Sequence, residues 1–388
     1  MLCEQSSYGS GASSGNLGLV AVSHSVPLAS PGVISQALRW LSRFNSPLTI
    51  AFPPSPDLLR WLWQFCRASF SAGYAERAAT LTRLCLESAE IFHDLEQSLH
   101  FGLRCKGTLE IFSTTKGFQH FCSSVATMRS AGIDVEPLAS ADVRTLSPCV
   151  LPNIAGGAYY SADCFFNPAR FLAAIAARLY EMGVEMLNSC EVTRLRMQQG
   201  QVVAVDLEDA SVEVSGVVLA AGYQTNPLIQ SLGLKLPVQP ARGYTADFDV
   251  AGCVDLPTMF AEARLLATPM NDRLRIGGYL HLGNTRSLDS HRNVTSKQLA
   301  RPLRRYLQES WTQQLSSSAV PVWRGARPCS PDGLPIIGTI AKCSNLYFAT
   351  GHGMLGLTLG PITGKLIAGL LQGEPANPLL GPERFVCL

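Results

Sequence analysis

The most specific part of the sequence lies near its carboxy end. It reads Trp323-Arg-Gly-Ala-Arg327-Pro-Cys-Ser-Pro331-Asp-Gly-Leu-Pro335-Ile-Ile-Gly338 and resumes as Asn345-Leu-Tyr-Phe-Ala-Thr-Gly351-His352-Gly353-Met354-Leu-Gly356-Leu-Thr358. The apolar run 346–349 predicts a strand that enters the Gly-His-Gly turn and then a helix. Because a helix N-terminus offers free N–H groups, this turn suits the electron-rich edge of a ligand.

Arg327 is the candidate binding residue in this stretch. It precedes Pro328, and a residue before proline is held in an extended conformation. The planar guanidinium is suited to gripping a carboxylate through two parallel hydrogen bonds. The alternative is that Arg327 is an ordinary surface charge. The flanking glycine and proline favour the binding role.

A second candidate region is the hairpin at 192–207, followed by the apolar strand Val217-Val-Leu-Ala-Ala-Gly222. A buried strand that ends in glycine lets the backbone approach a flat or phosphorylated ligand without a Cβ in the way. The alternative is a core strand that ends in a turn.

A third candidate region begins at Glu4. A dinucleotide-binding unit places an acidic residue just after a strand, where the carboxylate accepts hydrogen bonds from ribose hydroxyls. The side chains of Ser13, Ser14 and Asn16, with the amides of Gly11–Gly18, would then receive phosphate oxygens. The alternative is a loosely ordered Gly/Ser-rich terminus.

The rest of the chain predicts an α/β protein. Periodicity and boundary residues indicate helices at 36–44, 57–70, 76–99, 118–131, 169–182 and 298–316, and strands at 107–113, 184–187, 192–196, 202–207, 216–221 and 273–278. Because strands alternate with helices and are followed by meander-like strands, we expect a parallel-sheet domain interrupted by a second domain.

Composition excludes several classes of protein. The 388 residues are 47% hydrophobic and 15% charged, with 31 basic against 29 acidic side chains, so the chain is neither disordered nor marked by the basic stripe of a nucleic-acid binder. The 12 cysteines are scattered and lack metal-ligand spacing, so we expect reduced, mostly buried thiols and no metal site.

We expect no targeting signal and no membrane-spanning segment. The first residues show no basic region followed by an apolar run, and the stretch 353–371 is interrupted by Pro361 and Lys365, which favours a buried helix over a membrane span. The aromatic stretch Leu58–Phe70 is expected to be a packed helix, with a membrane-surface helix as the alternative.

These three regions together resemble the FAD-dependent D-amino acid oxidase superfamily, most closely its bacterial D-amino acid dehydrogenases of the small-subunit type, with glycine oxidases more distant. The resemblance extends to Gln239-Pro-Ala-Arg-Gly-Tyr244 and Leu274-Arg-Ile-Gly-Gly278. It implies a two-domain flavoprotein fold, in which a Rossmann-like FAD domain (1–50, 138–235 and 318–388) is interrupted by a substrate domain with an antiparallel-rich sheet (51–137 and 236–317).

The resemblance also implies roles for individual residues. Arg327 binds the substrate carboxylate, Tyr244 is a second substrate contact or a core residue, and His352 packs or hydrogen-bonds beside the flavin rather than acting as a base. Cofactor contacts are implied for Glu4, Ser13, Ser14, Asn16, Gly18, Val192, Ala220, Ala221, Gly222, Gly351, His352, Gly353, Met354, Gly356, Leu357 and Thr358. Gly325 stands where some relatives have a flavin-linking cysteine and Cys329 is displaced, so we expect non-covalent FAD.

One feature departs from the family pattern. The first strand and the Gly-x-Gly-x-x-Gly loop, which should precede Glu4 by about 20 residues, are missing from the sequence, in which only Met1, Leu2 and Cys3 precede Glu4. We expect either an upstream start or a shortened protein with weakened FAD binding.

The activity implied by the resemblance is oxidation of a D-amino acid or related amine. Hydride passes from Cα to flavin N5, and the imino acid is hydrolysed to a 2-oxo acid and ammonia. Orientation supplies much of the acceleration. Two alternatives stay open: a subunit of an opine- or hydroxyproline-type dehydrogenase, and a non-catalytic homologue. We expect a quinone, a carrier or oxygen as the electron acceptor and no nucleic-acid partner. We also expect a cytoplasmic location. Contact with the inner face of the plasma membrane, or with a partner subunit, stays open.

Overall fold

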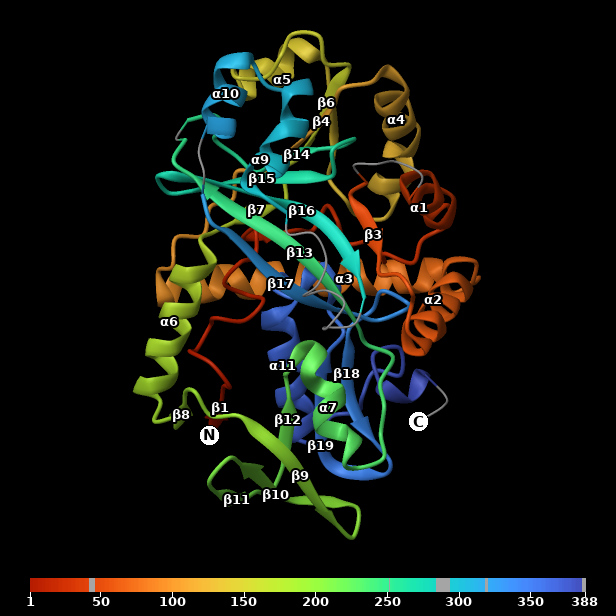
Figure 1. The fold of residues 1–388 in the computed structure, drawn as a ribbon, viewed down its shortest axis with the longest axis vertical. Helices are drawn as coiled ribbons and strands as arrows, with labels where there is room; N and C mark the ends of the chain where they lie inside the picture. The colour runs from red at the N-terminus through yellow and green to blue at the C-terminus, as the bar shows by residue number, and fades with distance from the viewer. Residues whose placement is uncertain (42–45, 251, 284–293, 318–319, 386–388) are drawn as a thin grey trace.

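The chain folds into an elongated mixed α/β structure, as expected (Figure 1). The computed structural model describes residues 1–41, 46–250, 252–283, 294–317 and 320–385. Long strands cross the middle of the molecule on a diagonal and connect its upper and lower parts, and the long helix α3 (Tyr74–Leu99) lies across the same region.

The upper part is built on the largest sheet. Nine strands of the described residues form it, in the order β17-β13-β16-β15-β14-β4-β6-β5 with β3 beside β16. Their bounds are β17 (Val322–Cys329), β13 (Gln239–Phe248), β16 (Arg273–Leu282), β15 (Leu265–Met270), β14 (Thr258–Phe260), β4 (Thr108–Phe112), β6 (Gly156–Tyr160), β5 (Glu136–Leu138) and β3 (Leu48–Ile50). Most neighbours are antiparallel; β14 with β4 and β16 with β3 are parallel. The antiparallel-rich sheet predicted for one domain is therefore present.

The lower part contains parallel strands in two separate pieces. Strand β12 (Val217–Leu219) runs parallel to β19 (Cys343–Thr350), which also pairs with β18 (Ile336–Ile340). Strand β1 (Leu2–Cys3) runs parallel to β8 (Met186–Leu187). No described strand pairs with both pieces. Helices α3 and α11 (Gly360–Leu371) pack together beside β18 and β19 through buried aliphatic side chains.

The division of the parallel strands corrects one expectation. The segment 216–221 was expected to be a buried strand, but β12 ends at Leu219, Val218 is 43% exposed and Ala220 is also exposed. In the described residues β12 pairs with β19 alone, so one edge of the strand lacks cover.

Most predicted helices are present within a few residues of their expected bounds. They are α1 (Val33–Leu41), α2 (Pro56–Ser69), α3, α4 (Thr115–Ser130) and α6 (Pro168–Glu181); positions 42–44 of the first prediction lie outside the described residues. The single helix expected at 298–316 is wrong: it is divided into α9 (Ser296–Ala300), the 3-10 turn η2 (Arg301–Arg305) and α10 (Glu309–Ser317). Pro302 near the start of η2 explains the interruption, because proline has no N–H to continue a helix.

The hairpin is also confirmed. Strand β9 (Val192–Gln198) pairs with β10 (Gln201–Leu207), and β11 (Ser211–Glu213) adds to the far side of β10. The turn at Gln199 and Gly200 has positive φ at both residues, which is the turn geometry that matches the twist of paired strands.

The cysteines differ from the expectation in one place. Cys105 and Cys164 form a disulfide across 59 residues of sequence, so the prediction that all thiols are reduced is wrong for this pair. The two chain segments form an antiparallel bridge at the adjacent pair Arg104 and Phe165, which brings the cysteines opposite each other. Cys85, Cys149, Cys253, Cys329 and Cys343 are buried free thiols, as predicted.

Helix α2 has two different faces. Leu58, Trp61 and Phe65 are buried, which confirms the packed-helix interpretation for that side. Trp63 is 58% exposed and Phe70 76% exposed, so the membrane-surface alternative stays a prediction. Within the described ranges, no helix has the length and apolar character that crossing a bilayer demands.

The amino-terminal loop is fastened to the large sheet. Arg275 on β16 pairs with Asp247 on β13 through two contacts of 2.6 and 2.8 Å, and its remaining nitrogen donates to the carbonyls of Ser14 and Asn16. The Thr245 hydroxyl donates to the Gly15 carbonyl. The chain then enters β2 (Leu19–Val20), which pairs with β7 (Cys164–Phe165). The loop that begins at Glu4 is therefore a bridge between the two parts of the molecule.

The two-domain boundaries stay a prediction. Strands β3, β6 and β17 belong to the large sheet, although the prediction assigns their residues to the FAD domain. The chain thus crosses between the two parts several times, which is compatible with an interrupted domain.

Substitution of Gly18 tests how closely the amino-terminal loop packs against the segment at Phe166. Its φ is +71°, and a Cβ there would lie 2.1 Å from the Phe166 carbonyl oxygen. Gly18→Ala is expected to lower the free energy of unfolding by about 3 kcal/mol, since left-handed strain and overpacking each cost roughly 1–3 kcal/mol. Urea denaturation measures the change.

The matched control is Gly32→Ala. Gly32 has a similar φ of +83°, and a Cβ added there would meet no atom within 4 Å, so only the strain of about 1 kcal/mol applies. Equal losses in the two variants would contradict the packing account.

Candidate active site

Three of the predicted cofactor regions meet at the carboxyl ends of the parallel strands. Glu4 follows β1, Gly222 follows β12 and Gly351 follows β19. The two strand pieces are joined there, because the Gln224 amide donates a 2.8 Å hydrogen bond to the side-chain oxygen of Gln5. In open α/β sheets, ligands bind in the crevice beyond the carboxyl ends of the strands. The structure therefore brings Glu4 and the two glycines to the edge where a ligand is expected.

Glu4 is fixed by its backbone. Its N–H donates to the Leu187 carbonyl, and its own carbonyl accepts from Cys190. Its carboxylate accepts a 3.2 Å hydrogen bond from the Ser6 amide. Val192, another predicted cofactor contact, begins β9 two residues after Cys190. The hydrogen bond from Cys190 to Glu4 therefore places the start of β9 near Glu4, and the cofactor roles of Glu4 and Val192 stay predictions.

The serines and asparagine of the loop make internal hydrogen bonds. The Ser14 hydroxyl donates to the Gly11 carbonyl at 3.0 Å, and the Asn16 side-chain oxygen accepts from the Gly18 amide at 2.8 Å. Ser13 is exposed. Gly18 faces the Phe166 carbonyl, so packing between β2 and β7 explains why a glycine stands there. The phosphate-binding role of these residues stays a prediction.

The Gly-His-Gly turn is formed, but the helix after it starts later than expected. Gly351 and Gly353 have φ of +75° and +56°. A 3-10 turn, η3 (Gly353–Leu355), follows, and α11 begins only at Gly360. Met354 is 55% exposed beside this turn, and Gly356 faces the Cβ of His352. We call residues 351–353 the hinge.

Leu357 and Thr358, which follow the hinge in the chain, are buried. The Thr358 hydroxyl accepts from the Ala21 amide and donates to the Leu19 carbonyl, at 3.2 and 3.1 Å. The Thr358 carbonyl accepts from Ser88 on α3. Their direct contact with a cofactor stays a prediction; in the structure Thr358 ties the hinge segment to β2 and α3.

His352 is held as a neutral hydrogen-bond donor. Its Nε2 lies 3.0 Å from the Thr363 hydroxyl, which itself donates to the Leu359 carbonyl. Because the hydroxyl proton is committed to that carbonyl, Nε2 carries the hydrogen. Burial lowers the pKa of His352 to about 4. This arrangement agrees with a packing role and leaves no charged imidazole at neutral pH.

Arg327 lies next to the hinge. Cys329, two residues further along β17, forms an antiparallel bridge with His352, and Pro328 is close to Gly222. The guanidinium donates a 3.1 Å hydrogen bond to the Tyr279 carbonyl and lies flat over Gly243, where a Cβ would be 2.3 Å from its central carbon. Only glycine leaves room for this approach.

Among the described residues, the guanidinium of Arg327 forms no ion pair with a carboxylate. Burial lowers its pKa, so the surroundings disfavour the charge rather than stabilise it. A partly buried cation that lacks a carboxylate partner among the described residues is suited to an anionic ligand.

Tyr244 is separated from Arg327 by the sheet. Arg327 lies opposite Ala241 in the register, and Tyr244 lies opposite Arg324. Since neighbouring residues of a strand face opposite sides, the Tyr244 side chain points away from Arg327. It is 2% exposed, and its hydroxyl lies 3.0 Å from Nδ1 of His281. This geometry fits the core alternative; a substrate contact stays only a prediction.

Cys329 is buried beside the hinge, and its carbonyl accepts from the Trp61 indole. Burial raises the pKa of its thiol to about 11, so the nucleophilic thiolate is disfavoured. A covalent link to a cofactor through this residue is therefore disfavoured.

Gly243, Tyr279 and Trp61 were not predicted as site residues. Gly243 and Tyr279 contact Arg327, and these contacts depend on the register of β13 with β17 and with β16. Trp61 reaches Cys329 from α2. Gly243 lies within the motif Gln239–Tyr244, which was the only available signal.

The site has the features of an enzyme that uses a nucleotide cofactor: small residues at strand ends, an acidic residue after β1 and a guanidinium that has no carboxylate partner among the described residues. A family model described as FAD dependent oxidoreductase, DAO, matches residues 1–370. The chain belongs to this family.

Curated proteins similar to this chain include D-amino acid dehydrogenases. The chain is 30% identical over 380 residues to a D-amino acid dehydrogenase of Methylobacterium sp. (strain 4-46), covering 95% of this chain and 88% of the relative. It is 29% identical over 372 residues to one of Agrobacterium fabrum, with coverages of 92% and 86%.

Solved structures show the same fold. Glycine oxidase of Geobacillus kaustophilus matches with a TM-score of 0.76 at 20% identity, covering 98% of this chain and 91% of that one. An L-α-glycerophosphate oxidase of Mycoplasma pneumoniae with FAD bound matches with a TM-score of 0.71 at 14% identity, covering 98% and 90%. FAD is thus the cofactor of this family.

The residues fit the two ends of FAD. At one end, the exposed Ala220 and the turn at Gly222 leave an uncovered edge beside the hinge. At the other end, Glu4 and Val192 supply a carboxylate and a strand start. Between them lies the loop 5–16, whose role in binding the diphosphate stays a prediction.

The state of His352 predicts a pH effect on stability. Its pKa is about 4 when folded and about 6.5 when unfolded, so its protonation favours unfolding. Stability from this group is complete above about pH 6.5 and is lost as the pH falls toward 4, by at most about 1.4 kcal/mol per pH unit. We expect His352→Gln to flatten the dependence of stability on pH between pH 4 and 6.5, as measured by urea midpoints at pH 4.5 and 7.5.

The control is His120→Gln, at an exposed histidine, which should leave the dependence of stability on pH unchanged. If stability depends on pH as steeply in His352→Gln as in the wild type, the account is contradicted.

Proposed function

We propose that the protein oxidises a D-amino acid, or a related amine that bears a carboxylate, and that Arg327 fixes the carboxylate. The main support is the position of the Arg327 guanidinium. Arg327 lies two residues before Cys329, which forms the β-bridge with His352 of the hinge. Its guanidinium donates to the Tyr279 carbonyl and has no carboxylate partner in the described residues. The names of the curated relatives support a D-amino acid as the substrate.

The position of Arg327 on β17 supports binding of the carboxylate by this one arginine. Residues 327 and 329 are on the same face of β17, about 6–7 Å apart along the strand. A carboxylate on Arg327 would therefore present the neighbouring carbon toward the hinge. The five N–H donors of arginine permit a two-point grip, which fixes the direction of the substrate as well as its place.

The reaction requires little from acid–base groups. FAD, when bound, supplies the electron-accepting chemistry: the Cα–H bond breaks, its hydrogen and electron pair leave the substrate, and a C=N bond forms with the amine nitrogen. Water then hydrolyses the imino acid to a 2-oxo acid and ammonia. Neutral His352 donates to Thr363 and keeps the hinge in shape, so its role is positioning.

Turnover would also require an acceptor for the two electrons taken from the substrate. A quinone, a protein carrier or oxygen would serve, and the exposed aromatic side of α2, with Trp63 and Phe70, is a surface for contact with a membrane or a partner subunit. A cytoplasmic location with peripheral membrane contact fits this proposal.

A second candidate function follows from the divided sheet. If the gap between β1 and β12 prevents FAD binding, the chain is a non-catalytic homologue. The flavin absorption of the purified protein separates the two: a flavin spectrum with turnover of D-amino acids and an artificial electron acceptor supports the enzyme, and a colourless protein that fails to bind added FAD supports the homologue.

Arg327→Leu tests the binding role. Loss of a buried charge-assisted contact costs about 2–5 kcal/mol, so kcat/KM should fall on the order of 100-fold or more, mainly through KM. The flavin spectrum should be unchanged. Steady-state kinetics with a series of D-amino acids measures the effect.

Arg324→Leu is the matched control, since it removes the same charge from the opposite face of β17. It should keep KM within about threefold of wild type, as expected of an exposed charge. Similar KM values in the Arg327 and Arg324 variants would remove Arg327 from the site.

A further inference from the structure

A second cluster of reactive side chains lies away from the hinge and the Arg327 site. His93 on α3, Cys105 and Cys164 on β7 place their ligand atoms within 4.8 Å of one another. Nε2 of His93 lies 3.9 Å from Sγ of Cys105. None of the three residues belongs to the catalytic account above.

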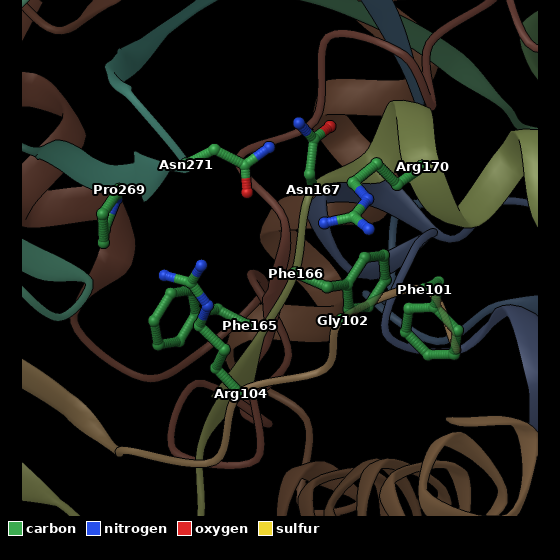
Figure 2. A pocket seen from close by; sticks show the side chains of 9 residues that line it. All are labelled: Phe101, Gly102, Arg104, Phe165, Phe166, Asn167, Arg170, Pro269 and Asn271. Carbon is green, nitrogen blue, oxygen red and sulfur yellow. The ribbon is translucent and has the colours of Figure 1, made fainter. Parts of the chain in front are cut away.

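The backbone around the cluster is firmly held. Arg104 and Phe165 exchange two hydrogen bonds of 2.8 Å, so Cys105 and Cys164 are the adjacent pair across this antiparallel bridge. Asp163 is fully buried, and its side chain accepts from the Ser23 amide at 2.9 Å. Figure 2 shows Arg104 and Phe165, the neighbours of the two cysteines, side by side on the wall of a small surface pocket, with the guanidinium of Arg104 over the Phe165 ring.

Two of the three side chains are open to solvent. His93 and Cys105 are exposed, and Cys164 is buried. A reagent can therefore reach the Cys105 sulfur and the imidazole, whereas Cys164 forms the inner wall. This is the accessibility that reduction of a disulfide or entry of a metal ion requires.

We propose that, once the Cys105–Cys164 disulfide is reduced, His93, Cys105 and Cys164 bind one Zn²⁺ ion, with water in the fourth position. Two thiolates and an imidazole are ligands that zinc prefers. With Zn–S of about 2.3 Å and Zn–N of about 2.0 Å, tetrahedral ligand atoms lie roughly 3.5–3.8 Å apart. The distance from His93 to Cys105 is already close to this value.

The chemistry of the exchange balances. A dithiol reductant gives two electrons and two protons to the Cys105–Cys164 bond, which breaks, and the reductant becomes a disulfide. Zinc then replaces the two thiol protons, which are released to solvent. The sulfurs must separate from about 2 Å to about 3.8 Å, and the exposed position of Cys105 permits this movement.

Zinc would join three elements where the disulfide joins two. The disulfide connects the segment at Cys105 to β7, and zinc would add α3 through His93. Oxidised protein and zinc-bound protein are therefore alternative forms of one site. This inference does not depend on the proposed function.

The test uses the full chain, reduced with a dithiol, freed of reductant without air, and mixed with Zn²⁺. We expect about one Zn²⁺ per reduced chain by elemental analysis after gel filtration, none above background for the oxidised chain, and a higher melting temperature only when reduced protein and zinc are both present. Co²⁺ in place of Zn²⁺ should give a thiolate charge-transfer band and tetrahedral d–d bands.

Cys105→Ser and His93→Gln should each lose the bound zinc and the cobalt spectrum. The matched controls are Cys122→Ser and His120→Gln, at exposed residues outside the cluster, which should retain both. If reduced wild type holds no more zinc than Cys105→Ser, or if His93→Gln gives an unchanged cobalt spectrum, the proposed site is wrong.

Discussion

The partly buried positive charge of Arg327 is the constraint on which the proposed site depends. Desolvation penalises an isolated guanidinium, and the described residues supply it with a carbonyl but with no carboxylate. A protein maintains such a charge at a cost in stability, and a ligand that brings the missing anion recovers that cost. The hinge and the strand ends matter because they set what can lie beside that anion.

Several parts of the fold serve to hold this charge in place. Gly243 gives the guanidinium a flat surface of backbone, and the register of β13 with β17 puts that glycine beneath it. The bridge between Cys329 and His352 fixes the end of β17 to the hinge. Thr358 then ties the hinge segment to β2, which follows the loop pinned by Arg275.

The sequence could predict those features whose cause is local. The hinge, Arg327 in an extended strand and the hairpin at 192–207 follow from residues close together in the chain, and the structure contains all of them. The family resemblance was carried by the same motifs. What it implied about fold, cofactor and enzyme class is confirmed.

Other features depended on distant pairing and could not be predicted. Tyr244 was grouped with Arg327, but only the register shows that the two face opposite sides of the sheet. The Cys105–Cys164 disulfide joins residues 59 positions apart, with no spacing signal in either segment. The uncovered strand β12 looked buried because its composition is apolar, whereas cover depends on which strands are its neighbours.

The central claim is that a carboxylate bound by Arg327 lies against the flavin. Titration of the FAD-loaded protein with benzoate, followed by the flavin absorption spectrum, tests it most directly. We predict a saturable spectral change in wild type and in Arg324→Leu, and no change in Arg327→Leu at the same FAD content. An equal response in Arg327→Leu would contradict the claim.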